Sequence, residues 1–321
     1  MSLINSPFSP DALALDPNKF RDKVWTASGA KRATVKLVGL RMLWFNTGTL
    51  CNITCAACYT ESSPGNDTLA YLRAEDVAIY LEEIRTRSLP TEEIGITGGE
   101  PFMNPEIIAI IEAPLERGFR TLVLTNGLEP MRRFEAGLLA LLARFGDLLT
   151  LRVSLDHHDP EVFEAERGVG TWGLATDGLV WLARAGFRVA VAGRRLPGES
   201  EADARAGYRA LFARLGVDLD VERSECLMFL PEMDGDADAP EITETCWSVI
   251  GRSPEMMMCA SSRMVVRRRG ETRPRVVACV LLPYDPQFDL GATLGEARRM
   301  VALNHPHCAR FCVLGGGSCS S

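Results

Sequence analysis

The sequence contains no apolar run that approaches the roughly 18 residues of a membrane-spanning helix, no internal repeat and no low-complexity tract. Residues 1–7 lack a basic region followed by an apolar core, so no secretory signal is expected. The sequence also lacks a basic excess: 35 Lys and Arg stand against 42 Asp and Glu, for a net charge of −7. Because nucleic-acid binders usually carry a basic face, these absences predict a cytoplasmic protein with no membrane and no nucleic-acid partner.

Cysteine is absent between residues 59 and 225, although the chain contains 10 cysteines. Three of them lie within residues 51–58, and the others follow from Cys226 onward. A disulfide framework would not need to avoid the middle of the chain so completely. In a reducing compartment, cysteines act more often as metal ligands or reactive thiols, and we expect that here at both ends of the chain.

The chain has 321 residues and is 46% hydrophobic, which is enough for one large α/β domain and a smaller appendage. From residue 42, short apolar stretches alternate with helical patterns, which predicts a parallel sheet with crossover helices. An open doubly wound sheet and a partial barrel both fit this alternation. The strands are expected at residues 42–45, 93–97, 121–125, 149–155, 187–192 and 217–221. The helices are expected at residues 73–88, 106–117, 132–145, 171–185 and 201–215.

The cysteines Cys51, Cys55 and Cys58 form a C-x3-C-x2-C motif in the loop that leaves the first expected strand. A closed zinc site needs four ligands, usually as two separated pairs. A four-iron–four-sulfur cluster also has four metal corners. Three local thiolates would therefore leave one iron open to bind a small molecule, which is a catalytic arrangement. A zinc or redox site is the alternative.

Three more turns fall at the carboxyl ends of the following strands, the edge that carries the chemistry of such sheets. They are Gly98-Gly99-Glu100-Pro101, Thr125-Asn126-Gly127 and Ser154-Leu155-Asp156. Glycine allows the backbone to approach a ligand closely, and the Glu100 carboxylate can accept a hydrogen bond from an ammonium group. The turns therefore predict a ligand site beside the cysteine loop.

The cysteine motif followed by Gly98–Pro101 resembles the radical S-adenosylmethionine (radical SAM) superfamily over residues 42–222. The resemblance implies a partial (β/α)6 barrel, and a [4Fe-4S] cluster on Cys51, Cys55 and Cys58 with SAM bound to its open iron. One electron would cleave SAM to methionine and a 5′-deoxyadenosyl radical, which abstracts hydrogen from a substrate. The resemblance also implies that several further residues bind SAM: Tyr59, Gly98, Gly99, Glu100, Asn126, Ser154 and Arg167.

Each of these assignments has a simpler reading. Asn126 belongs to an ordinary Asn-Gly turn, Ser154 fits a buried serine whose hydroxyl bonds to the backbone, and Arg167 fits a surface arginine. His157 and His158 follow at the same rim, and we expect them to be solvated.

The segment after residue 223 is irregular and rich in cysteine, with a hairpin expected around Gly270 from residues 263–269 and 275–282. It resembles the C-terminal SPASM extension, or its shorter relative twitch, which binds auxiliary [4Fe-4S] clusters. The late cysteines lack one member of the full pattern, so the resemblance implies one auxiliary cluster. The expected ligands are Cys259, Cys279, Cys308 and Cys312, with Cys319 as a rival for the fourth place and Cys246 as a lesser one.

The domains expected from these patterns are an N-terminal lead-in over residues 1–40, a radical SAM partial barrel over 41–223 and an auxiliary-cluster domain over 224–321. The expected activity is hydrogen abstraction from an unidentified substrate, and a small molecule is favoured because the lead-in is short for a peptide-binding domain. An electron donor such as flavodoxin or ferredoxin is expected as a partner. The alternatives are a peptide- or protein-modifying maturase and a non-enzymatic zinc or iron–sulfur binding protein.

Overall fold

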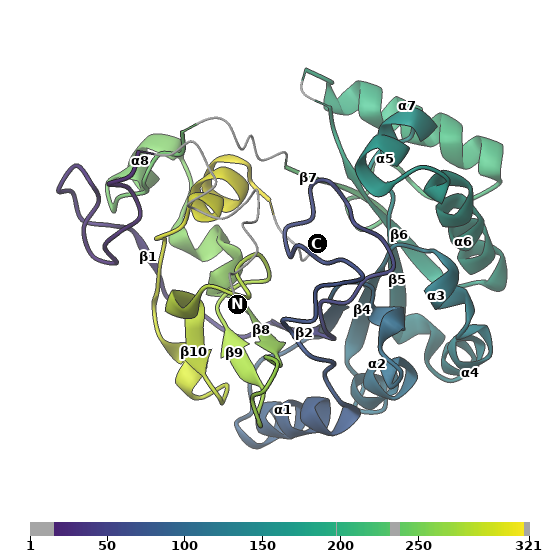
Figure 1. Ribbon diagram of the computed structural model, residues 1–321, viewed down its shortest axis with the longest axis horizontal. Helices are drawn as coiled ribbons and strands as arrows, with labels where there is room; N and C mark the ends of the chain where they lie inside the picture. The colour runs from purple at the N-terminus through teal and green to yellow at the C-terminus, as the bar shows by residue number, and fades with distance from the viewer. Residues whose placement is uncertain (1–15, 197, 232–237, 318–321) are drawn as a thin grey trace.

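A nine-stranded sheet organises the protein in the order β10-β9-β8-β2-β3-β4-β5-β6-β7. The computed structural model describes residues 16–196, 198–231 and 238–317. Strands β2 to β7 run parallel to their neighbours and curve into an arc (Figure 1). Their bounds are β2 Met42–Asn46, β3 Glu93–Thr97, β4 Arg120–Thr125, β5 Leu149–Ser154, β6 Arg188–Arg194 and β7 Leu227–Leu230.

Helices cover the outer side of the arc, as Figure 1 shows for α1, α2, α4, α6 and α7. The cause is visible in β2, whose side chains alternate between two apolar layers. Leu43 and Phe45 belong to the layer under the helices, and Met42 and Trp44 to a smaller cluster on the inner face. The helix bounds are α1 Ala74–Thr86, α2 Ile107–Leu115, α3 Glu129–Arg132, α4 Glu135–Phe145, α5 Pro160–Arg167, α6 Thr171–Ala185, α7 Glu201–Leu215 and α8 Cys246–Ile250.

The sixth parallel strand differs from the expected one. Residues 217–221 are not a strand: α7 ends at Gly216 in a left-handed conformation, and Val217 and Val221 are buried as parts of a connecting segment. A turn at Asp220, whose carbonyl accepts the Arg223 N–H at 3.2 Å, then leads into β7. The apolar pattern of residues 217–221 therefore comes from a buried loop. The number of parallel strands is still six, as predicted, because β7 takes the place of the strand expected at residues 217–221.

The cysteine-rich C-terminal segment continues the same sheet. Strand β8, Ser262–Val266, pairs with β9, Arg275–Val277, as the expected hairpin, and β10, Asp289–Gly291, pairs with β9. Strand β8 also runs parallel to β2, so the C-terminal segment lies beside the strand that precedes the cysteine loop. The division at residue 223 remains a prediction, and the sheet is continuous across it.

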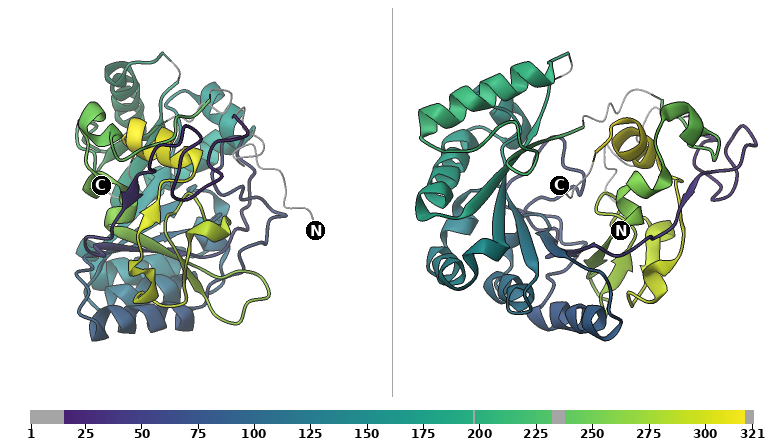
Figure 2. Two further views of the ribbon diagram at one scale, coloured as in Figure 1. Left: turned by 90° about the vertical axis from the view of Figure 1, so that its left-hand side faces the viewer. Right: turned by 180° about the vertical axis from the view of Figure 1, so that it is seen from behind.

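The described part of the N-terminal lead-in packs on the C-terminal segment. Strand β1, Thr34–Val35, pairs with β11, Val301–Ala302, and the Val38 N–H donates to the carbonyl of Ala260 at 2.8 Å. The buried guanidinium of Arg32 pairs with Glu241 at 2.5 Å. The two views in Figure 2 show the purple N-terminal chain beside the green and yellow C-terminal elements. Across the described ranges, no helix is long and apolar enough to cross a membrane.

Candidate active site and cysteine clusters

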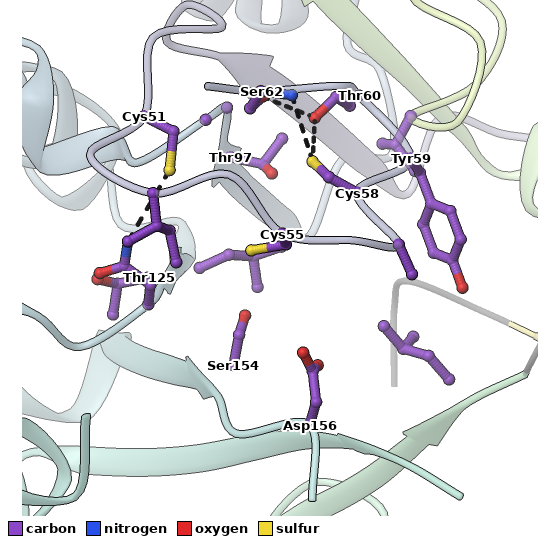
Figure 3. Close-up of a pocket in the computed structure, with 18 of the residues that line it drawn as sticks. Cys51, Cys55, Cys58, Tyr59, Thr60, Ser62, Thr97, Thr125, Ser154 and Asp156 are labelled. Atoms are coloured by element: carbon purple, nitrogen blue, oxygen red, sulfur yellow. Dashed lines mark hydrogen bonds between the residues drawn. The ribbon is translucent and has the colours of Figure 1, made fainter. Parts of the chain in front are cut away.

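A cavity of about 220 Å³ lies at the carboxyl ends of the parallel strands, where the cysteine loop crosses them (Figure 3). It contains every barrel residue that the sequence assigned to cofactors except Glu100. The assigned residues that line it are Cys51, Cys55, Cys58, Tyr59, Gly98, Gly99, Asn126, Ser154 and Arg167. The parallel sheet therefore brings together, at one edge, residues as far apart in the sequence as Cys51 and Arg167.

The cysteine loop is held by main-chain bonds and offers donors to its own sulfur atoms. The Cys51 N–H donates to the Ser63 carbonyl at 3.1 Å, which closes the loop at its base. The Ser62 N–H donates to Cys58 Sγ at 3.3 Å, and Asn126 Nδ2 approaches Cys51 Sγ at 4.0 Å. N–H groups directed at sulfur favour the thiolate form, which is the form that binds metal.

The three thiols lie close enough together that the charges of Cys55 and Cys58 raise the pKa of Cys51. A closed zinc site needs four ligands, and the loop supplies three cysteines. A four-iron–four-sulfur cluster held by these three thiolates would keep one iron open. The donor set therefore fits an iron–sulfur cluster with an open iron.

Burial raises the pKa of Cys51 to about 12 and that of Cys55 to about 11. The Arg167 guanidinium opposes this shift at Cys55, because a nearby cation stabilises the thiolate. At neutral pH these thiols would stay protonated without a metal cation, and metal binding would release their protons. The donor set is therefore suited to soft iron and is poorly suited to acting as free reactive thiols.

Gly98 and Gly99 bring strand β3 against the cysteine loop. The Gly99 N–H donates to the Gly48 carbonyl at 2.8 Å, and the Glu100 N–H to the Leu50 carbonyl at 3.1 Å. A Cβ at Gly99 would lie 2.2 Å from the Leu50 carbonyl oxygen. The sequence predicted close approach to a ligand. The structure shows close approach to the chain that carries Cys51, and both glycines also line the cavity.

The Glu100 carboxylate is 2% exposed and does not line the cavity. It accepts hydrogen bonds from the Asn126 N–H at 2.7 Å, the Thr125 hydroxyl at 2.9 Å and the Phe102 N–H at 3.1 Å. Burial raises its pKa to about 7, and these three donors limit the shift. Glu100 therefore joins the ends of β3 and β4, and its expected contact with an ammonium group remains a prediction.

Tyr59 and Asn126 are both engaged at the cavity wall. The Tyr59 hydroxyl donates to the Pro231 carbonyl at 3.2 Å, and its ring meets Phe311 edge to face at a centroid distance of 5.9 Å. Asn126 Nδ2 donates to Asn52 Oδ1 at 2.8 Å, which ties the end of β4 to the cysteine loop. Both positions are consistent with a wall beside a bound cofactor.

Arg167 is a cavity residue and not a surface arginine. It forms a two-point ion pair with Asp156, from Nε to Oδ2 at 2.6 Å and from Nη2 to Oδ1 at 3.1 Å. Figure 3 shows Ser154 and Asp156 extending from one side of the cavity toward Cys55 on the other. Asp156 was not assigned a site role from the sequence, although its position directly after a strand was a usable signal.

Arg194 is a cavity residue that the sequence did not identify. It ends β6, its guanidinium lies 6.0 Å from the centre of the Tyr59 ring, and its backbone N–H donates to the Asp156 carbonyl at 2.7 Å. The rule that strand ends carry the chemistry would have found it.

His157 is buried and His158 is half-buried, whereas we expected both to be solvated. Their rings stack at 4.2 Å, and His157 is 5% exposed. These two rings and Glu199 place ligand atoms within 4.8 Å of one another. His157 Nδ1 accepts the Asp159 N–H at 3.0 Å, and its Nε2 lies 3.5 Å from a carboxylate oxygen of Glu199. The main-chain bond at Nδ1 leaves only Nε2 of His157 available to a ligand.

A second small cavity contains the four first-choice auxiliary ligands, Cys259, Cys279, Cys308 and Cys312. Its other lining is mostly apolar, and burial raises the pKa of Cys259 to about 12 and of Cys279 to about 11. Four thiols in one mostly apolar cavity fit one auxiliary cluster. Cys319 lies outside the described residues, and Cys246 is not part of this cavity.

The two cavities share a wall. Leu281 lines both, and Phe311, which lies between Cys308 and Cys312 in the π-helical turn Cys308–Leu314, lines the first. Tyr284 fixes this segment to the cysteine loop, since its hydroxyl donates to the Thr60 carbonyl at 2.6 Å. The C-terminal segment therefore closes one side of the main cavity.

This architecture, a mostly parallel α/β sheet with three thiols at its carboxyl edge, defines an iron–sulfur enzyme class. The sequence profile of the Radical SAM superfamily matches residues 45–209, just over half of the chain, so the protein belongs to this superfamily of enzymes. Members of the superfamily bind a [4Fe-4S] cluster and SAM, and relatives of the SPASM type carry auxiliary clusters.

Two curated relatives share part of the chain. GTP 3′,8-cyclase of Streptomyces coelicolor is 36% identical over 118 residues, which cover 36% of this chain and 32% of that protein. The antilisterial bacteriocin subtilosin biosynthesis protein AlbA of Bacillus subtilis is 33% identical over 118 residues, covering 37% of this chain and 25% of AlbA. The chain thus spans about a third or less of the length of these relatives.

The crystal structure of Streptococcus suis SuiB bound to S-adenosylmethionine has the same fold. It superposes with a TM-score of 0.56 at 14% identity, covering 79% of this chain and 64% of SuiB.

Proposed function

We propose that the protein cleaves SAM reductively and uses the resulting radical to abstract hydrogen from a substrate held in the main cavity. The observation that carries this proposal is the single cavity shared by Cys51, Cys55, Cys58 and the turns of β3, β4 and β5. The thiols supply the soft ligands that an iron–sulfur cluster requires, and the turns supply polar groups beside them.

The reduced cluster, when bound, supplies one electron that splits SAM into methionine and a 5′-deoxyadenosyl radical. The chain's own residues position the reactants. Gly98 and Gly99 hold β3 against the cysteine loop, and Asn126 holds β4 to it. Ser154, Arg167 and the other lining groups offer polar contacts to SAM, and the apolar side chains of Leu281 and Phe311 limit water on the C-terminal side.

We further propose that Cys259, Cys279, Cys308 and Cys312 hold one auxiliary [4Fe-4S] cluster. The shared wall at Leu281 supports a role in accepting an electron from substrate after hydrogen abstraction, or in orienting the substrate. The electron donor would be a small reductant protein such as flavodoxin or ferredoxin.

For the substrate, a small molecule is the leading proposal, because the main cavity is modest in size and is bounded by Arg194, Tyr59 and Phe311. A peptide side chain is the second candidate. It is favoured by the similarity to AlbA, whose name records a role in bacteriocin biosynthesis.

The decisive experiment is anaerobic reconstitution with iron and sulfide, followed by reduction in the presence of SAM. We expect a brown protein with about eight irons per chain, as two [4Fe-4S] clusters require, and formation of 5′-deoxyadenosine. A colourless protein that retains zinc, or a loaded protein that forms no 5′-deoxyadenosine with dithionite or titanium(III) citrate, would reject the proposal. A count of about four irons with SAM cleavage intact would reject only the auxiliary cluster.

A further inference from the structure

Arg263 is a buried cation near the start of β8, the first strand of the C-terminal hairpin. It is 1% exposed, and it lies in β8 next to the parallel strand β2. Its guanidinium donates only to main-chain carbonyls: Nε to Ala297 at 2.9 Å, and Nη1 to Cys259 at 2.6 Å and to Ser262 at 2.7 Å. Nη2 lies 3.5 Å from the Arg299 carbonyl. These main-chain contacts engage the guanidinium, but they leave its positive charge uncompensated.

No carboxylate lies within 4.0 Å of this guanidinium among the residues that the structure describes. Two other arginines with little exposure are different: Arg32 pairs with Glu241, and Arg167 with Asp156. An isolated buried charge is costly, so buried charges in proteins are usually paired with an opposite charge.

The ionisable groups whose charges act on Arg263 are the thiols of Cys259 and Cys279. Both line the auxiliary cavity, and Arg263 is bonded directly to the main chain of Cys259. Four thiolates around a [4Fe-4S] cluster would give this place a net negative charge beside the guanidinium.

We propose that Arg263 is the counter-charge of the auxiliary iron–sulfur cluster and raises its reduction potential. The inference rests on the proposed auxiliary cluster. It assigns to a residue other than the four cysteine ligands the role of setting the reduction potential. Net charge and nearby hydrogen bonds are the levers by which a protein sets such a potential. A fixed cation stabilises the reduced, more negative state, so the cluster accepts an electron more readily.

The test uses the full chain with Cys51, Cys55 and Cys58 all changed to Ala, so that only the auxiliary cluster contributes a signal. For this parent we measure the iron content and the midpoint potential of the cluster. The potential is obtained from electron paramagnetic resonance spectra recorded during a titration with dithionite. The same measurements are made with Arg263→Gln, which removes the charge, and with Arg263→Lys, which keeps it. Arg269→Gln is the matched control. Arg269 belongs to the connection between β8 and β9, its side chain is 67% exposed, and it pairs with Asp67.

The proposal expects Arg263→Gln to shift the potential to a lower value, with Arg263→Lys and Arg269→Gln close to the parent. Loss of the cluster in Arg263→Gln but not in Arg263→Lys would also support it, because the charge alone separates the two. Three results would overturn the proposal: the same potential in Arg263→Gln as in the parent, the same shift in Arg263→Gln and Arg263→Lys, or loss of the cluster in both variants. Each would show that Arg263 acts only through its hydrogen bonds to main-chain carbonyls. A parent without iron would instead reject the auxiliary cluster itself.

Discussion

Arg167 and Asp156 join two adjacent parts of the barrel edge through their side chains. Asp156 follows β5 directly, and Arg167 is the last residue of α5, so the ion pair closes the β5–α5 connection over the cavity. Both side chains are nearly buried, at 13% and 9% exposure, and the arginine lies beside Cys55. Asp156 therefore neutralises Arg167 close to the thiols of the cysteine loop.

Changing Asp156 to Asn should lower the free energy of unfolding by about 3–5 kcal/mol, because it leaves a buried guanidinium without its partner. SAM should also bind less well, since Arg167 would lose its fixed orientation. Thermal unfolding and equilibrium SAM binding measure the two effects. Glu129→Gln is the control: it breaks an exposed pair with Arg133 and should cost less than about 1 kcal/mol. Equal losses in both variants would contradict a special role for the Asp156 pair.

Gly99→Ala should destabilise the protein by about 1–3 kcal/mol, the usual range for overpacking, and should reduce the iron bound by the first cluster. The new Cβ would meet the Leu50 carbonyl oxygen at 2.2 Å and push the chain that leads into Cys51. Gly65→Ala is the control, because Gly65 lies in the cysteine loop itself and a Cβ there meets nothing within 4 Å. Iron analysis and thermal unfolding should separate the two, and normal iron content in Gly99→Ala would refute this coupling.

The stability of the protein should depend on pH through Glu100. Its pKa is raised from 4.5 to about 7 by burial, so the folded state favours the protonated acid. The corresponding stability is present in full below pH 4.5 and is lost as the pH rises through about 7, by about 3 kcal/mol in total. Thermal unfolding of wild type and Glu100→Gln between pH 4.5 and 8 measures it. The stability of wild type relative to the variant should fall between pH 4.5 and about 7 and level off above that, and a constant difference would show that folding does not raise the pKa of Glu100.

Cys55→Ala should abolish 5′-deoxyadenosine formation, because two thiols cannot hold the first cluster with its open iron. Cys312→Ala should leave SAM cleavage intact but stop substrate turnover, because it changes only the second cavity. Chromatographic detection of 5′-deoxyadenosine, with iron counts for each variant, distinguishes the two. Cys226→Ala is the control, since Cys226 lines neither cavity and should retain both activities. Complete loss of cleavage in Cys312→Ala would show that the division of roles is wrong.

The sequence predicted the parallel sheet and the edge at which the site lies, because both depend on local patterns. Cys51, Cys55 and Cys58 share one loop, and Gly98 and Gly99 share one turn. Residues 217–221 were misassigned because a buried loop and a buried strand have the same apolar pattern.

The rest of the site depends on contacts that no local pattern contains. The burial of Glu100 follows from donors at Thr125 and Asn126, one strand away. Phe311 reaches Tyr59 only because β8 places the C-terminal segment beside β2. The close approach at Gly99 to the Leu50 backbone was not predicted, and the approach of the two glycines to a ligand stays a prediction, with both lining the cavity.

The pairing of the N-terminal segment with the C-terminal one has a consequence for biosynthesis. Arg32 is synthesised more than 200 residues before its partners Glu241 and the Leu303 carbonyl. Strands β2 to β6 can pair with their neighbours as they emerge, whereas β1 must wait for β11, the strand with which it pairs. The first described strand is therefore among the last of the described strands to find its place, and the pocket for the second group of thiols can be completed only after Cys312 has been synthesised.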